Sequence, residues 1–308
     1  MAHGHSHDHS HGHANAGVRA LGWTLVLLAA YTVAEVAGGL ATDSLALLAD
    51  AGHMLSDVLS ILLALGAIWL ARRPATPDRS FGYRRAEIIA AFLNGLLLVL
   101  VAAWVLFEAV RRLSDPPEVR GGWMLVVAVG GLIVNLAAFA ILARSGRESL
   151  NVEAALRHVL ADVLGSVGVI VASLVILTTG WELADPIVSA VIALLIVASA
   201  WGVLRDSGHI LLEGAPTGIA AGEVEQVILG VPGVRSVHDL HVWTITSGFD
   251  ALSAHVLVAR DEDCHALRRA VEDELATSFG IRHTTLQVDH EAARLVQISR
   301  SGGGRPRP

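Results

Sequence analysis

The sequence of 308 residues contains no lysine and a single cysteine, Cys264. One thiol excludes an internal disulfide framework and a cluster of thiolate ligands within one chain. Apart from histidine, the basic residues are therefore all arginines. They do not cluster along the chain, so the sequence does not indicate nucleic-acid binding. Charged residues make up only 17% of the chain. This scarcity of charge argues against an ordinary soluble protein.

What replaces charge is apolar surface. Hydrophobic residues make up 53% of the chain and the mean hydropathy is +0.57, so a lipid bilayer is the natural solvent. About 20 apolar residues suffice to cross the hydrocarbon core. We expect six such helices, at roughly 17–41, 44–71, 86–112, 120–142, 152–180 and 185–205.

Arginine in the short loops sets the expected orientation. Arginines are dense between the second and third spans and recur between the fourth and fifth, whereas Arg111, Arg112 and Arg120 run against this pattern. The balance places both termini and the polar last third in the cytoplasm. The histidine-rich start lacks the regions of a cleavable signal peptide. The all-arginine basic content favours a bacterial inner (plasma) membrane.

One short sequence motif, H-x-L-x-D-V-L, occurs twice, at residues 53–59 and 158–164. Each copy places an imidazole and a carboxylate four residues apart, on one face of a helix. An ionisable side chain inside an apolar span is costly and indicates a functional site. Two such pairs facing each other supply two nitrogens and two oxygens, enough for one tetrahedral metal ion. The predicted ligands are His53, Asp57, His158 and Asp162.

The alternative interpretation is that these four residues only form hydrogen bonds that hold packed helices together. With the amino terminus inside, the two spans run antiparallel, and both pairs lie near the middle of the membrane, where many secondary transporters place a shared site. For the other polar groups within the spans, Glu35, Asn94 and Asn135, we expect interhelical hydrogen bonding.

The donor types indicate the metal. Imidazole with carboxylate suits Zn2+ first, and also accepts Cd2+, Co2+, Ni2+ and Fe2+. Copper(I) would require thiolate or thioether ligands, which Cys264 and three methionines do not assemble. A histidine must be neutral to bind a metal, so metal and protons compete for one site. We therefore expect a secondary transporter that exchanges a divalent metal for protons.

The expected domains are a flexible histidine-rich tail at 1–16, a transmembrane domain at 17–205, a cytoplasmic metal-binding domain at 206–292 and a disordered tail at 293–308. The first tail alternates histidine with small residues, a metal-binding composition. Its histidines are His3, His5, His7, His9, His11 and His13.

Hydrophobic periodicity in the last third predicts a small α+β domain. The expected order is a helix at 221–230, strands at 237–246 and 251–259, a helix at 264–279 and a strand at 284–289. Histidine is dense here, and we expect at least three of these residues, with Asp289, to bind metal. The candidates are His238, His241, His255, His265, His283 and His290.

Four segments carry a resemblance to a known family: 48–57 (L-A-D-A-G-H-M-L-S-D), 79–87, 155–162 and 237–243. Over about residues 15–290 the chain resembles the cation diffusion facilitator family, and its zinc-transporting members in particular. The resemblance implies a homodimer, six transmembrane helices, a ferredoxin-like cytoplasmic domain and proton-coupled metal efflux. It also implies that His53, Asp57, His158 and Asp162 are the transport ligands.

By the same resemblance, the cytoplasmic metal sites map onto five residues, with His241 and His283 as additional or alternative ligands. These five are His238, His255, His265, Gln287 and Asp289. The loop at 72–85 contains no histidine, so we expect no strong site there. An enzyme is not expected, because the H-E-x-x-H motif of a membrane metalloprotease is absent from the sequence. A membrane-anchored metal sensor or scaffold is the alternative to a transporter.

Overall fold

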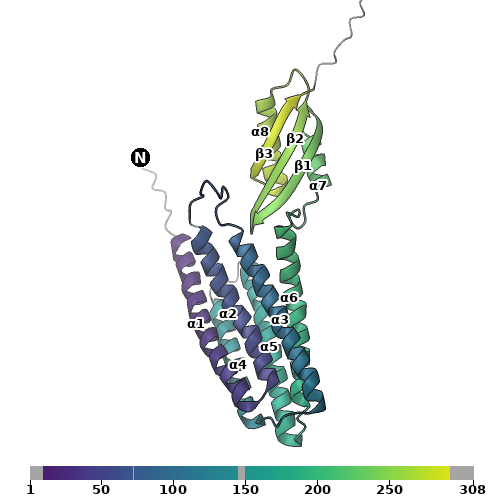
Figure 1. Cartoon of the computed structure of the whole chain (residues 1–308). Coiled ribbons are helices and arrows are strands. Elements are labelled where there is room, and N and C mark those ends of the chain that lie inside the picture. The colour runs from purple at the N-terminus through teal and green to yellow at the C-terminus, as the bar shows by residue number, and fades with distance from the viewer. Residues whose placement is uncertain (1–9, 72, 145–149, 292–308) are drawn as a thin grey trace, which may run out of the picture. The chain divides into compact units, whose positions relative to one another are not determined.

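The structure is a computed structural model that describes residues 10–71, 73–144 and 150–291. Side chains of residues 10–24 and 141–161, and of a few positions in the second half of the second helix, lie outside this description. The chain divides into two compact units, Met1–Gly208 and His209–Pro308. Figure 1 shows that the first unit is built from long helices and the second from a small sheet with two helices. The side chains of both predicted tails lie outside the described residues.

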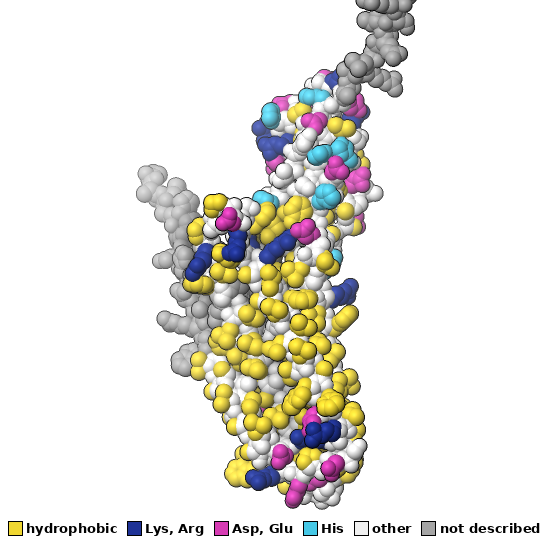
Figure 2. Space-filling view, viewed as in Figure 1, with side chains coloured by type: hydrophobic (Ala, Val, Ile, Leu, Met, Phe, Trp, Pro, Cys, Tyr) yellow, Lys and Arg dark blue, Asp and Glu magenta, His cyan; other side chains and the backbone are white. Residues whose placement is uncertain are grey.

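The first unit is a bundle of six long helices. They are α1 Ser10–Thr42, α2 Leu45–Ala71, α3 Ala86–Ser114, α4 Gly121–Arg144, α5 Leu150–Thr179 and α6 Ala184–Leu211. Among the described residues, five of these helices are long and apolar enough to cross a membrane; α2 contains positions outside the description. Hydrophobic side chains cover most of the visible face of this unit, and charged ones gather toward its two ends (Figure 2). The predicted membrane-spanning helical region is confirmed.

The start of α2 is held by a carboxylate from α6. Asp185 is fully buried, and its oxygens accept hydrogen bonds from the Ser44 hydroxyl at 2.6 Å and from the backbone N–H groups of Leu45 at 2.8 Å and Ala46 at 3.2 Å. Arg112 of α3 lies 3.9 Å from the same carboxylate. Backbone N–H groups at a helix start have no partner within the helix, so this acceptor satisfies them and ties α2, α3 and α6 together.

Small residues allow α1 and α4 to pack closely. A Cβ atom at Gly38 would lie 2.8 Å from Val127 Cγ2, and one at Gly131 would lie 2.9 Å from the Tyr31 hydroxyl. Tyr31 fills the space beside Gly131 and donates a hydrogen bond to the Val127 carbonyl. Close approach at small residues is the usual way in which membrane helices associate.

The second unit follows the predicted order of elements. These are α7 Ala221–Leu229, β1 Val234–Thr246, β2 Phe249–Val258, α8 Cys264–Phe279 and β3 His283–His290. The strand order is β1-β2-β3, with β2 antiparallel to β1 and parallel to β3. The hairpin turns at Gly248, whose φ of 71° suits a glycine. Thus the predicted small α+β domain is confirmed.

Both helices of this unit cover one face of the sheet with apolar side chains. Ile228 of α7 and Leu275 of α8 are fully buried and pack with Leu252, Ala254 and Val256 of β2. Alternate residues of a strand point to opposite faces, so His255 lies on the other face of β2. The register pairs His255 with His238 of β1 and with Gln287 of β3, which places these three residues in one row across the sheet.

Candidate metal centre

Two helices bring an imidazole and two carboxylates together inside the first unit. His53 and Asp57 lie one turn apart on α2, and Asp162 lies on α5. His53 Nε2 is 3.0 Å from Asp162 Oδ1 and 4.0 Å from Asp57 Oδ2. One ligand atom from each residue lies within 4.8 Å of the other two. Three of the four ligands that the repeated motif predicts therefore lie close together.

The spacing of these atoms matches a tetrahedral metal. Zinc bonds of about 2.0–2.2 Å place two ligand atoms of a tetrahedron about 3.3–3.6 Å apart. The two separations from His53 Nε2, 3.0 Å and 4.0 Å, lie on either side of that value. Side-chain exposure is only 14% for His53 and Asp57 and 9% for Asp162. A dication bound here would exchange most of its bound water molecules for protein ligands.

The fourth predicted ligand, His158, lies in α5 one turn before Asp162. Its side chain lies outside the described residues. The helix itself is continuous from Leu150 to Thr179, so the four-residue spacing places His158 and Asp162 on the same face of α5.

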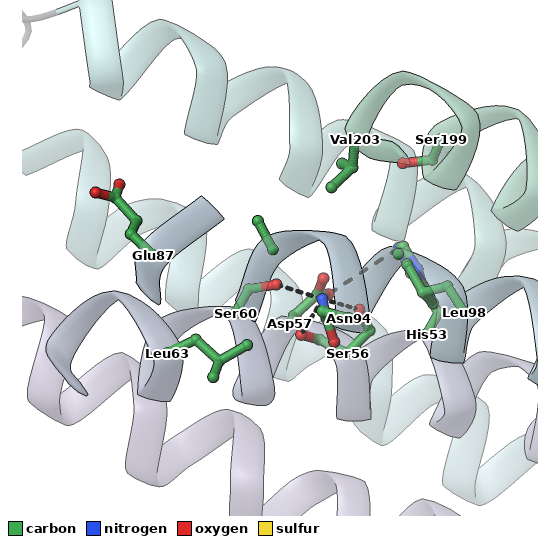
Figure 3. Close-up of a pocket in the computed structure, with 12 residues that line it drawn as sticks. His53, Ser56, Asp57, Ser60, Leu63, Glu87, Asn94, Leu98, Ser199 and Val203 are labelled. Atoms are coloured by element: carbon green, nitrogen blue, oxygen red, sulfur yellow. Dashed lines mark hydrogen bonds and ion pairs between the residues drawn. The ribbon is translucent and has the colours of Figure 1, made fainter. Parts of the chain in front are cut away.

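A cavity of about 290 Å³ extends from His53 and Asp57 between α2, α3 and α6 (Figure 3). Its lining includes Ser60 of α2 and Glu87 at the start of α3, and Ser199 and Val203 of α6 close it from the other side. The metal centre is therefore connected to the end of the bundle at which α3 begins.

Asn94 of α3 fixes the α2 turn that carries Asp57. Its side-chain N–H groups donate to the hydroxyls of Ser56 and Ser60, both at 2.9 Å, as the dashed lines in Figure 3 show. Similarly, Asn135 of α4 donates to Ser166 Oγ of α5 at 3.3 Å. The predicted interhelical hydrogen bonding of the two asparagines is confirmed.

In the second unit, His238, Asp239 and His255 each offer a ligand atom within 4.8 Å of the other two. His238 Nδ1 lies 3.3 Å and His255 Nδ1 lies 3.6 Å from Asp239 Oδ2. The two imidazoles face each other across β1 and β2, with ring centroids 5.1 Å apart. All three side chains are at least 41% exposed, so this group is open to solvent.

Sequence reasoning missed Asp239. It lies at an irregularity of β1, where the pairing with β2 shifts register between His238 and His241, and its φ is 50°. This distortion turns Asp239 toward His255. The sequence of one strand does not reveal such a register shift. The only sequence feature that could have indicated Asp239 as a ligand is its position next to His238.

Among the described residues of the second unit, six predicted ligands lie outside this group, and their roles stay predictions. They are His241, His265, His283, Gln287, Asp289 and His290. Asp289 accepts a hydrogen bond from the Gln287 side chain at 2.7 Å, and the His283 ring lies 5.3 Å from that of Phe249. His290 Nε2 is 3.4 Å from Cys264 Sγ.

Two family models match the chain and together cover most of it. The model described as "Cation efflux transmembrane domain" matches residues 23–212, and "Cation efflux protein, cytoplasmic domain" matches residues 216–291. The chain belongs to the cation efflux family. The resemblance predicted from the sequence is thereby confirmed: the protein is a metal efflux transporter of the membrane, and not an enzyme.

Curated relatives of this family are similar over nearly their whole length. The "Cadmium, cobalt and zinc/H(+)-K(+) antiporter" of Bacillus subtilis (strain 168) is 42% identical over 274 residues, which cover 87% of this chain and 88% of the relative. The "Zinc transporter ZitB" of Escherichia coli (strain K12) is 41% identical over 293 residues, covering 94% and 93%. A solved structure, "Metal-bound C-terminal domain of the CzcD transporter from Cuprividus metallidurans", shares 38% identity over 23% of this chain and 97% of its own, with a TM-score of 0.22.

Proposed function

We propose that this cation efflux protein exports Zn2+ from the cytoplasm in exchange for protons, with Cd2+, Co2+, Ni2+ and Fe2+ as further substrates. The observation that carries the proposal is the convergence of His53, Asp57 and Asp162 between α2 and α5. Mixed imidazole and carboxylate donors suit zinc and its neighbours. The names of two relatives, a zinc transporter and a cadmium, cobalt and zinc antiporter, agree with this choice.

His158 completes the proposed site as its fourth ligand. Its spacing from Asp162 repeats the spacing of His53 from Asp57, so each helix contributes one nitrogen and one oxygen. Two neutral imidazoles and two carboxylates give the bound dication a net charge of zero. A neutral complex is far cheaper to hold inside a membrane than a bare charge.

Proton exchange follows from the ligands themselves. An imidazole can hold either a proton or a metal ion on a given nitrogen, but not both. With both termini in the cytoplasm, the cavity that reaches Glu87 opens toward the cytoplasm and admits the metal. When the same site faces outward, the higher proton concentration there displaces the metal. Competition at a site of alternating access therefore couples the two fluxes.

The proposed assembly is a homodimer in a bacterial inner membrane. The second unit belongs to the cytoplasmic domain of the family, and its exposed group of His238, Asp239 and His255 is a candidate regulatory metal site. The domain limits predicted from the sequence, 17–205 and 206–292, are retained in this proposal.

Zinc uptake into proteoliposomes, with an imposed pH gradient, tests the function. We expect Asp57→Asn and Asp162→Asn each to lower transport at least about tenfold, because each removes one anionic ligand. Asp115→Asn, at an exposed position after α3, is the matched control and should transport normally. Zinc uptake that ignored the pH gradient would contradict proton exchange.

The alternative of a membrane-anchored metal sensor or scaffold gives the opposite result. A sensor would bind zinc through the second unit and would move no zinc across the bilayer. Asp57→Asn would then leave its zinc response unchanged, whereas Asp239→Ala would weaken it.

A further inference from the structure

The loop between α2 and α3 is basic and folds back on itself. Its residues 73–85 include four arginines and one aspartate. Thr76 and Arg79 pair through two backbone hydrogen bonds, of 3.2 Å and 2.9 Å. Gly82 has a φ of 64°, and a Cβ atom there would lie 3.9 Å from the Arg73 carbonyl oxygen. The two arms of the loop therefore lie side by side and present one compact basic surface.

Two arginines of this loop are positioned by aromatic rings. The guanidinium carbon of Arg73 lies 4.3 Å from the centroid of the Trp69 ring, and that of Arg79 lies 4.4 Å from the centroid of the Tyr83 ring. Both arginines are exposed, and Trp69 is 60% exposed. Attraction to the face of a ring fixes the position of a guanidinium group and leaves its N–H groups available to an acceptor.

The arginines at the two ends of the bundle differ in their partners. At the end of α3 that is remote from the loop, Arg111 lies 3.4 Å and Arg112 lies 3.2 Å from carboxylate oxygens of Glu108. Within the part of the chain that the structure describes, no ion pair joins Arg73 or Arg79 to a carboxylate. The charge of these two arginines is therefore available to an anion from outside the chain.

The position of the loop indicates which anion this is. The loop joins two membrane helices at one end of the bundle, the level at which a bilayer presents its headgroups (Figure 1). Trp69, in the last turn of α2, and Phe81, which is 45% exposed, are aromatic residues of the kind that lie at this level. Arginine and hydrophobic side chains lie next to one another at this end of the bundle (Figure 2). Phosphate oxygens accept paired N–H groups from one guanidinium.

We propose that Arg73 and Arg79, held by Trp69 and Tyr83, bind the headgroup of an anionic phospholipid. Their N–H groups donate to the phosphate oxygens, while the exposed ring of Trp69 contacts the lipid beside the headgroup. A zwitterionic lipid such as phosphatidylcholine carries its own cation, so it binds this surface less tightly than phosphatidylglycerol. The inference needs only the membrane-spanning bundle and does not depend on the transported metal or on proton exchange.

Quenching of Trp69 fluorescence by brominated lipids tests the proposal on the full chain in reconstituted vesicles. The Trp69 signal is the difference between the wild type and Trp69→Phe. Brominated phosphatidylglycerol should quench this signal at lower mole fractions than brominated phosphatidylcholine does, and equal quenching by the two lipids would overturn the proposal. One arginine near an anionic surface contributes about fivefold to binding. Arg73→Gln and Arg79→Gln should therefore each lower the preference for phosphatidylglycerol about fivefold.

Arg111→Gln is the matched control, because it removes an exposed arginine that already has a carboxylate partner. It should keep the wild-type preference. A preference that survived in both loop variants would refute the assignment to these arginines. Soluble glycerol phosphate should leave the quenching unchanged, since it lacks the acyl chains. If it abolished the preference, the loop would bind a free phosphate group and the proposed lipid site would be wrong. The comparison of the two lipids in the wild type decides the matter even if a variant fails to fold.

Discussion

Replacement of Asp185 by alanine tests how much the contact between α6 and the start of α2 stabilises the protein. The carboxylate is fully buried and accepts three hydrogen bonds, from the Ser44 hydroxyl and from the N–H groups of Leu45 and Ala46. These three donors belong to residues with no exposed surface, so water does not replace the lost acceptor. Arg112 would keep its contact with Glu108 at 3.2 Å.

The magnitude follows from these contacts. A buried donor that loses its acceptor costs about 1–3 kcal/mol, and three independent losses would amount to about 3–9 kcal/mol. The donors share one acceptor and can relax together, so their losses are not additive. We expect Asp185→Ala to lower the free energy of unfolding by about 3–5 kcal/mol, the range for breaking a buried charged contact. Asp185→Asn keeps one acceptor oxygen and should cost about half as much.

Denaturant unfolding in detergent, followed by the loss of helical circular dichroism, measures this difference. The control is Asp115→Ala, at an exposed position, which should stay within about 0.5 kcal/mol of the wild type. A change of less than about 1 kcal/mol in Asp185→Ala would show that the capped end of α2 contributes little, and would refute the reasoning.

Three further changes test the packing and the second unit. Gly38→Ala places a Cβ 2.8 Å from a stiff valine of α4 and should destabilise the bundle by about 1–3 kcal/mol in the same unfolding assay. Gly280→Ala forces a side chain into a left-handed conformation, φ 72°, and should lower the melting temperature of the second unit through a loss of about 1 kcal/mol. The backbone N–H groups of Ala266 and His265 lower the pKa of Asp263, so its cap stabilises α8 above the usual aspartate pKa and is lost as the pH falls through the lowered value. Asp263→Ala should remove that part of the acid dependence, which melting curves between about pH 5 and pH 2 would detect.

Local patterns predicted much of the fold. The helix predicted at 264–279 is α8 itself, because an aspartate cap and a terminal glycine mark its two ends. In the bundle, the spacing of His53 and Asp57 placed two ligands on one face of α2 without any knowledge of the neighbouring helices. The second copy of the motif, on α5, then indicated Asp162 as a ligand from the facing helix. In the structure Asp162 Oδ1 lies 3.0 Å from His53 Nε2.

What the sequence could not provide were contacts between distant residues at irregular backbone. Asp185 and Ser44 are 141 residues apart, and no periodicity connects them. The turn before α2 has an unusual conformation at Asp43, φ 56°, which lets the helix start meet α6. Asp239 joins the histidines only because β1 shifts register beside it.

Among the described residues, the polar contacts of α2 are different at its two ends. At its first residues α2 is bound to α6 through Asp185, with Arg112 of α3 beside it. Past His53, the same three helices surround the cavity of about 290 Å³, and Asn94 provides the hydrogen bonds between α2 and α3 there. In the proposed orientation, with both termini in the cytoplasm, the closed end faces outward and the cavity faces inward. The proposed outward release of the metal therefore requires α3 and α6 to separate from the start of α2, and the contacts of Asp185 are those that must break.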